Sequence, residues 1–424
     1  MRQNSKKLAF GASALLLAGA VTSTALSTTA LSGGFAVREQ STSGLGAAFA
    51  GNAAGYDLST IFWNPAGVAI AGPGVTTESH AALIIPDSEL TSLAPFADGA
   101  NDIGKIALVP GSYAAYRIND KWTIGYGFNA PFGLGTEADD KNWGGQLEFL
   151  KSELTTYNFN PVVGYQVSPT LSIGLGLQVQ YTDLRLSQSL VPPPTPSNTA
   201  TGVLKGDDWS FGYTAGLLWQ PAEGTSIGIG YRSMLEVELE GGLSLPGNTL
   251  PISGDLDQPE IATVSLRQSI NDRTRFLATF EWTNWSRLDR VPIVGSGGLE
   301  IIANWDDGYF LSGGLEYDYS DKLTVRGGVA YEWSPVQEAE QRLAYVPDSD
   351  RVWLSVGATY KWNEQTSIDL AYTHIFVEDG DINLQDGASP YVGEAESSVD
   401  IIGVSMKTKW GADGPFGLLS GFNN

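Results

Sequence analysis

The segment Val352–Trp362, which reads VWLSVGATYKW, decides the fold because its side chains change character at every second position. One face of an extended chain would carry Val352, Leu354, Val356, Ala358 and Tyr360, and the other Trp353, Ser355, Gly357, Thr359 and Lys361. A period of two is the pattern of a β-strand. The same alternation recurs in residues 173–181, 276–282 and 323–331. The sequence therefore predicts an all-β protein.

The connections between the predicted strands alternate in length. Six short links are rich in the Asn, Asp, Gly and Pro residues that suit tight reversals, namely INDKW, VSPTL, PAEGTS, INDRT, YSDKL and WNEQT. Seven longer polar segments lie near 87–103, 136–149, 189–206, 241–257, 287–300, 335–347 and 385–396. These connections predict about 14 strands, with short turns at one end and long loops at the other, as in an antiparallel transmembrane β-barrel.

A soluble β-sandwich also alternates, so two further features decide between the alternatives. The predicted strands are long enough for a tilted membrane crossing. Aromatic residues gather beside the short turns: Tyr116, Trp122, Trp219, Tyr317, Tyr319, Tyr360, Trp362 and Trp410. Amphipathic rings at one level are typical of an interfacial girdle. We predict a barrel over residues 74–410, followed by a C-terminal tail at 411–424.

The N-terminus resembles a secretory signal peptide. Basic residues precede an apolar run over 8–21, and small residues follow it. Cleavage after Ala20, Ala25 or Ala30 fits this pattern, and Ala30 is preferred because it leaves a mature start close to Gly33. An uncleaved anchor is the alternative. With residues 1–30 as a signal peptide, the chain is expected to be exported and, as a β-barrel, to lie in an outer membrane.

Composition excludes several classes of function. The net charge of −23 argues against nucleic acid as a partner, and the absence of Cys rules out disulfides and thiolate metal sites. His80 and His374 form no persuasive catalytic constellation, so neither an enzyme nor a cofactor is predicted, although a Ser–His hydrolase stays open as an alternative. The acidic stretches TEADD and VEDGDINLQDG are interpreted as solvated outer loops; Ca²⁺ or Mg²⁺ bridging to lipopolysaccharide is the alternative.

Residues 31–73 are rich in Gly and Ala and do not follow the strand pattern. A barrel of about 14 strands is too wide for side chains alone to fill, so a compact segment in the lumen would prevent leakage. Gly and Ala permit the close backbone packing that such a hatch requires. Within it, Asn64, Pro65 and Ala66 are expected to form a turn. A flexible leader is the alternative, but Ile61, Phe62 and Trp63 are costly in solvent.

Gly34-Phe35 and several ordered segments after it resemble the FadL-type transporters of long-chain fatty acids and hydrocarbons, which implies the outer membrane of a Gram-negative cell as the location. These segments are SGLGAAFAG at 43–51, WNPAG at 63–67, NAPFGLGTE at 129–137, KSELTTYNFNPVVGY at 151–165 and PDSDRVWLSVGATY at 347–360. The resemblance implies a lumenal hatch, with its Asn-Pro-Ala turn under a cargo pocket, and a kinked third strand that offers an exit into the bilayer. We also expect a monomer whose partners are a hydrophobic small molecule, outer-membrane lipid and lipopolysaccharide.

The third strand carries its own signal for a kink. Pro131 lies within the predicted strand and cannot donate a ladder hydrogen bond. We expect this strand to bulge inward, lose pairing with a neighbour and leave a lateral opening. The residues of this kink are Asn129, Ala130, Pro131, Phe132, Gly133 and Gly135. The alternative is that Pro131 merely ends the strand near the outer rim.

Candidate cargo contacts complete the prediction. A carboxylate cargo needs a cation beside an apolar pocket, and Arg351 beside Trp353 is the first candidate, followed by Arg326. Candidates for capture at the outer loops are Leu190, Val191, Leu204, Leu243, Leu245 and Leu250. We predict passive uptake of hydrophobic small molecules, first of all long-chain fatty acids, with alkyl or aromatic hydrocarbons as the alternative. A structural or adhesive surface barrel and a general porin are the alternatives of other classes.

Overall fold

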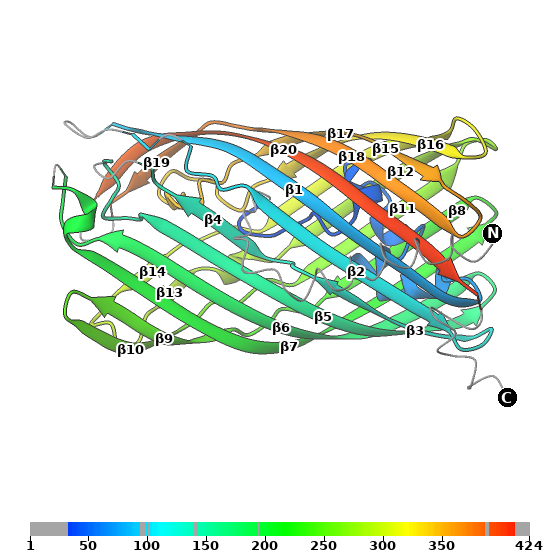
Figure 1. Ribbon diagram of the computed structural model, residues 1–424, viewed down its shortest axis with the longest axis horizontal. Helices are drawn as coiled ribbons and strands as arrows, with labels where there is room; N and C mark the ends of the chain where they lie inside the picture. Colours follow the sequence, from blue (N-terminus) through cyan, green and yellow to red (C-terminus); the bar gives the residue numbers. More distant parts are fainter. Residues whose placement is uncertain are drawn as a thin grey trace, which may run out of the picture.

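The computed structural model describes residues 33–93, 99–100, 102–139, 143–193, 195–385 and 390–411. These residues form a closed antiparallel β-barrel of 14 strands, as predicted (Figure 1). The predicted signal peptide with its cleavage sites, and the tail beyond residue 411, lie outside the described residues.

Ten barrel strands are continuous and four are interrupted. The continuous strands are β1 (Gly74–Ser92), β2 (Ala107–Arg117), β5 (Lys151–Ser168), β6 (Leu171–Ser189), β7 (Thr201–Ala222), β12 (Thr274–Thr283), β15 (Gly308–Asp318), β16 (Leu323–Trp333), β17 (Arg351–Lys361) and β20 (Tyr391–Trp410). The interrupted strands are β3 (Trp122–Asn129) with β4 (Gly133–Glu137), β8 (Thr225–Arg232) with β9 (Glu238–Leu245), β10 (Asn248–Asp255) with β11 (Ile261–Ser269), and β18 (Thr366–Val377) with β19 (Gly380–Leu384). Antiparallel pairing of β1 with β20 closes the barrel.

The apolar faces of the strands point outward. In β17, Leu354 and Val356 are 55% and 56% exposed, whereas Trp353 and Ser355, which alternate with them, are buried. Aromatic residues beside the short turns, such as Tyr319 and Trp362, are also exposed. This arrangement suits a lipid-facing surface with an interfacial girdle. Among the described residues, no helix is long and apolar enough to cross a membrane.

All six predicted short links connect neighbouring barrel strands. One predicted long loop is wrong, because residues 241–257 largely belong to the hairpin of β9 and β10, which turns at Pro246-Gly247. A second hairpin, β13 (Arg290–Pro292) with β14 (Glu300–Ile302), stands apart from the barrel sheet. Two short helices, η3 (Ser197–Thr199) and η4 (Trp285–Arg287), lie in other connections.

The N-terminal segment, residues 33–73, lies within the barrel (Figure 1, blue). It contains α2 (Thr42–Leu45), η1 (Asn52–Ala54), α3 (Thr60–Trp63) and η2 (Pro65–Ile70). Side chains from separate parts of the wall donate hydrogen bonds to its carbonyl oxygens: Tyr113 to Gln40 at 2.8 Å, Arg232 to Phe62 at 3.1 Å and Thr373 to Leu45 at 3.2 Å. Its role as a hatch stays a prediction.

Glycines in the wall permit this close packing. A Cβ at Gly228 would lie 1.7 Å from the carbonyl oxygen of Ala53, and one at Gly230 would lie 1.8 Å from that of Trp63. The small residues of β8 therefore bring the wall into direct contact with the backbone of the N-terminal segment.

Candidate functional site

A cavity of about 410 Å³ lies among the long connections of the barrel. Its size is within the range of small-molecule sites. Most of its wall is apolar, with side chains that include Leu186, Leu204, Leu243, Ile301, Leu343 and Tyr345. We call it the outer cavity, because it lies at the end with the long loops.

The structure brings together four of the six predicted capture residues. Leu190, Leu204, Leu243 and Leu245 line the outer cavity, whereas Val191 and Leu250 do not. Leu204 projects from β7, and Leu243 and Leu245 from β9, so these three lie on strands and not on loops. Their part in capture stays a prediction, but they share one apolar wall.

An apolar cluster continues from the outer cavity toward the middle of the barrel. It includes Leu204 and Ile301 from the cavity wall, then Leu184 and Val291, and reaches Phe132 in the kink. A second cavity of about 30 Å³ lies along this cluster and shares Leu204 and Ile301 with the outer cavity. Apolar side chains therefore connect the long-loop end to the interrupted third strand.

Aromatic rings form the inner end of this cluster. The ring centroid of Phe35 lies 4.7 Å from that of Trp285, 5.9 Å from that of Trp305 and 6.0 Å from that of Phe132. Phe35 belongs to the N-terminal segment and Phe132 to the kink, whereas Trp285 and Trp305 both belong to the long connection between β12 and β15. The contacts of Phe35 with Trp285 and Phe132 are edge-to-face, a geometry that stabilises aromatic pairs.

The third strand is interrupted at residues 130–132, where the sequence has Pro131, and the lateral opening expected there stays a prediction. β3 and β4 both pair with β5, but on the other side β2 pairs only with β3, and its register ends at Ser112 opposite Phe128. The strand resumes at Gly133, so Pro131 does not end it at the rim.

The N-terminal segment binds the backbone at the break. The amide of Val37 donates to the Pro131 oxygen at 2.8 Å, and that of Gly133 donates to the Phe35 oxygen at 2.9 Å. The Gln40 side chain donates to the Ala130 oxygen at 2.7 Å. Hydrogen bonds that the barrel ladder lacks at this point are thus supplied from inside.

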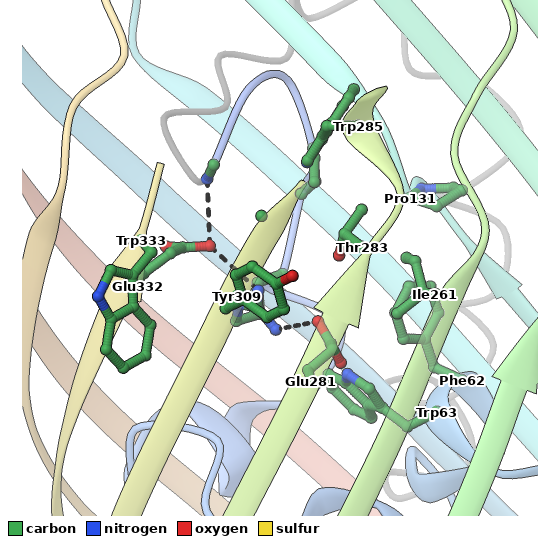
Figure 2. Close-up of a pocket in the computed structure, with 15 residues that line it drawn as sticks. Phe62, Trp63, Pro131, Ile261, Glu281, Thr283, Trp285, Tyr309, Glu332 and Trp333 are labelled. Carbon is green, nitrogen blue, oxygen red and sulfur yellow. Dashed lines mark hydrogen bonds and ion pairs between the residues drawn. The ribbon is translucent and has the colours of Figure 1, made fainter. Parts of the chain in front are cut away.

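A small inner cavity lies beside the break (Figure 2). Pro131, Trp285, Ile261 and Trp63 are among its lining residues, and its volume is about 20 Å³. That volume holds about one water molecule. A cargo molecule at this position therefore requires the N-terminal segment or the surrounding side chains to move.

Arg38 links the N-terminal segment to the wall at this cavity. Its guanidinium lies 2.5 Å from a Glu281 oxygen and 3.1 Å from a Glu332 oxygen, and all three side chains are buried (Figure 2). Glu332 also accepts from the Trp353 indole at 3.0 Å. A buried charge needs such partners, because leaving it unpaired is costly.

The predicted Asn64, Pro65 and Ala66 turn is fixed by the Asn64 side chain. Its Nδ2 donates to the carbonyl oxygens of Ala53 and Leu217 at 2.8 and 2.9 Å, and its Oδ1 accepts from the Ala66 amide at 3.0 Å. The turn therefore packs against the wall and begins η2. Whether it supports cargo stays a prediction.

The candidate cations for a carboxylate cargo have protein partners. Arg351 is buried and forms an ion pair with Asp348. Arg326 lies 3.5 Å from Glu316 and 3.4 Å from Asp369. A cargo carboxylate would have to compete with these residues, and the roles of Arg351, Trp353 and Arg326 in binding stay predictions.

The outer cavity also contains residues that sequence reasoning missed. The lining side chains with a formal negative charge are Glu148, Glu300 and Glu340, and no Arg or Lys is among the described lining residues. Burial raises the pKa of Glu148 to about 7. Trp285 and Trp305 were also missed, and their aromatic character in an otherwise polar connection was the only available signal. Phe35 was expected only as part of the N-terminal segment and not as a site residue. In the ranges that the structure describes, no group of three or more His, Cys, Asp or Glu could hold a metal ion.

Comparison with known proteins places this architecture in a family. Residues 23–410 match the family described as outer membrane protein transport protein (OMPP1/FadL/TodX). The long-chain fatty acid transport protein of Escherichia coli O6:H1 is 29% identical over 95% of this chain and 99% of its own length. The 47 kDa outer membrane protein of Pasteurella multocida is 34% identical over 80% of this chain and 86% of its own length.

Solved structures agree on the fold. A FadL homologue from Pseudomonas aeruginosa superposes with a TM-score of 0.79 at 24% identity, covering 88% of this chain and 99% of its own. The toluene transporter TodX of Pseudomonas putida gives a TM-score of 0.65 at 19% identity, over 84% of this chain and 94% of its own. The family consists of transporters and not of enzymes, which sets the hydrolase alternative aside. The chain belongs to the OMPP1/FadL/TodX family of outer-membrane transport proteins and is a β-barrel of the Gram-negative outer membrane.

Proposed function

We propose that this barrel takes up hydrophobic small molecules, with long-chain fatty acids or hydrocarbons as cargo. The names of the relatives support these two cargo classes, since they include a long-chain fatty acid transport protein and a toluene transporter. Cargo is captured in the outer cavity, moves along the apolar cluster and leaves through the wall at the break in the third strand. No step requires a nucleotide, because transfer out of water is favourable for apolar surface.

The observation that carries this proposal is the continuity of the apolar cluster. It runs from Leu204 and Ile301 in the outer cavity to Phe132 at the break without leaving the barrel. A general porin has a polar, water-filled lumen, and a surface adhesin has no need of such an interior. The apolar route therefore favours selective transport of apolar molecules over both alternatives.

The lateral exit follows from the backbone at the break. At Ala130–Phe132 the barrel ladder is replaced by hydrogen bonds to the N-terminal segment. If Phe35 and Val37 withdraw, the wall opens beside the bilayer, and irregular backbone is tolerated there because it lines a cavity. The N-terminal segment acts as the hatch that covers this exit. We propose that the barrel works as a monomer in contact with lipid and lipopolysaccharide.

The test places a charge in the middle of the route. Leu184→Arg, on β6 between the outer cavity and the break, should reduce uptake of labelled oleate and toluene to background in cells that lack other uptake proteins. Val294→Arg is the matched control, because Val294 is 65% exposed and lines none of the described cavities. Normal uptake by a correctly folded Leu184→Arg variant would exclude this route.

A further inference from the structure

The outer cavity combines an apolar wall with three carboxylates, and no Arg or Lys is among its described lining residues. Of its three carboxylates, Glu300 lies at the exposed rim, 3.5 Å from Arg290, and the exposed Glu340 accepts a hydrogen bond from Asn383 at 2.7 Å. Glu148 is more buried than either. Within the described residues, no hydrogen bond or ion pair is made by its carboxylate.

A fatty acid carboxylate entering this cavity would meet repulsion and would find no Arg or Lys among the described residues that line it. Two like charges in a partly buried site repel more strongly than in water, because the surrounding dielectric constant is lower. The headgroup would also lose hydration without gaining a charged partner. An alcohol or a hydrocarbon of the same chain length meets neither penalty and buries the same apolar surface.

We propose that the outer cavity selects uncharged apolar molecules over carboxylates of equal chain length, and that Glu148 sets this selectivity. The inference rests on the proposed function and narrows its cargo. Glu148, Phe149 and Tyr345 all line the outer cavity, and the ring centroids of Phe149 and Tyr345 lie 6.1 Å apart. The carboxylate of Glu148 therefore lies beside the apolar surface that a cargo chain would contact. It acts through its charge and not through any contact that holds the loop in place.

The experiment measures retention of radiolabelled decanol and decanoate by the full-length protein, purified in detergent and held on beads. At about pH 8, where Glu148 is ionised, the wild-type protein should bind decanol more tightly than decanoate. Glu148→Gln should increase the affinity for decanoate roughly three- to tenfold, the scale of one partly screened repulsion, and leave decanol unchanged. Preferential binding of decanoate by the wild type, or an equal change for both ligands, would overturn the proposal.

Two further variants locate the effect. Glu338→Gln removes the same charge from an exposed residue outside the cavity lining and should change neither affinity. Leu243→Asn, in the cavity wall, should weaken both ligands; if it weakens neither, the ligands bind elsewhere and the proposal fails. If no variant, the wild type included, retains either ligand, the proposed function fails as well, whereas binding without selectivity contradicts only the role of Glu148.

Discussion

Arg38 is the residue whose charge connects the N-terminal segment to the barrel wall. It is buried between Glu281 and Glu332, and its guanidinium also lies 3.8 Å from the centre of the Phe310 ring. Among the described residues, Glu281 has no other ion-pair partner, and the only other cation near Glu332 is Arg351, at 3.9 Å. Removing the cation therefore leaves two negative charges in a buried place.

We expect Arg38→Met to destabilise the packed N-terminal segment by about 3–5 kcal/mol, the usual cost of breaking a buried ion pair. Limited proteolysis should then cleave residues 33–73 faster, while the barrel keeps its heat-dependent gel mobility. The triple variant Arg38→Met, Glu281→Gln and Glu332→Gln should recover most of the protection, since it also removes the two negative charges that Arg38 compensates. Unchanged cleavage in the single variant would show that Arg38 does not anchor the segment.

The pKa of Glu148 determines how we expect cargo capture to depend on pH. Burial raises its pKa to about 7, so its carboxylate is neutral below that pH and charged above it. Free decanoate is already ionised over this interval, because ordinary carboxyl groups titrate near pH ~4–5. The other titratable groups that line the cavity are Glu300, Glu340 and Tyr345. Decanoate affinity should therefore rise as pH falls through about 7, and Glu148→Gln should remove this dependence. If the affinity of the wild-type protein for decanoate does not change with pH, this prediction is wrong.

At the scale of elements, the sequence predicts strands well where one face meets lipid. Val352, Leu354 and Val356 alternate cleanly because lipid accepts only apolar side chains. The hairpin of β9 and β10 was missed for the opposite reason. It extends among the long connections, and Gly241, Gly242 and Gly247 break its pattern so that it looks like a loop.

The candidate site was only partly predictable for a related reason. The kink follows from Pro131, a local property of one residue. The contacts of Phe35 with Trp285, and of Glu148 with the outer cavity, join segments far apart in the chain. Sequence patterns have short range, so they identify leucines in long connections without showing which of them share a wall.

The break in the third strand leads to a prediction about the exit route of the cargo. Ala130→Trp with Gly133→Arg adds bulk on both sides of Pro131, where the exit is proposed. Uptake of oleate and toluene should fall at least tenfold, roughly the effect of a raised barrier of about 1.4 kcal/mol. Cargo binding to the purified protein and the heat-dependent gel shift should both persist. Full uptake by this variant would leave passage through the N-terminal segment to the periplasm as the route.

On the scale of the whole molecule, the N-terminal segment and the barrel depend on each other in an unequal way. The 14 strands close through their own ladder, because β1 pairs with β20 over its length. The segment, in contrast, has little regular structure and takes its hydrogen bonds from the wall, at residues such as Tyr113, Arg232 and Thr373. The barrel should therefore fold without the segment, whereas the segment should not fold without the barrel.

Deleting residues 33–72 tests this asymmetry and the role of the segment as a hatch. The shortened chain should still migrate faster on a gel when unheated than when boiled, since the closed ladder of a barrel resists detergent until heated. In planar bilayers it should conduct ions continuously, because a lumen of 14 strands is too wide for side chains alone to fill. Small hydrophilic solutes should enter liposomes that contain the shortened chain but not those that contain the full one. The polar side chains that face the lumen, among them Glu281 and Arg232, would become hydrated and line the resulting pore. A deleted chain that folds yet remains closed would show that other parts of the barrel seal it and that residues 33–72 serve a different purpose.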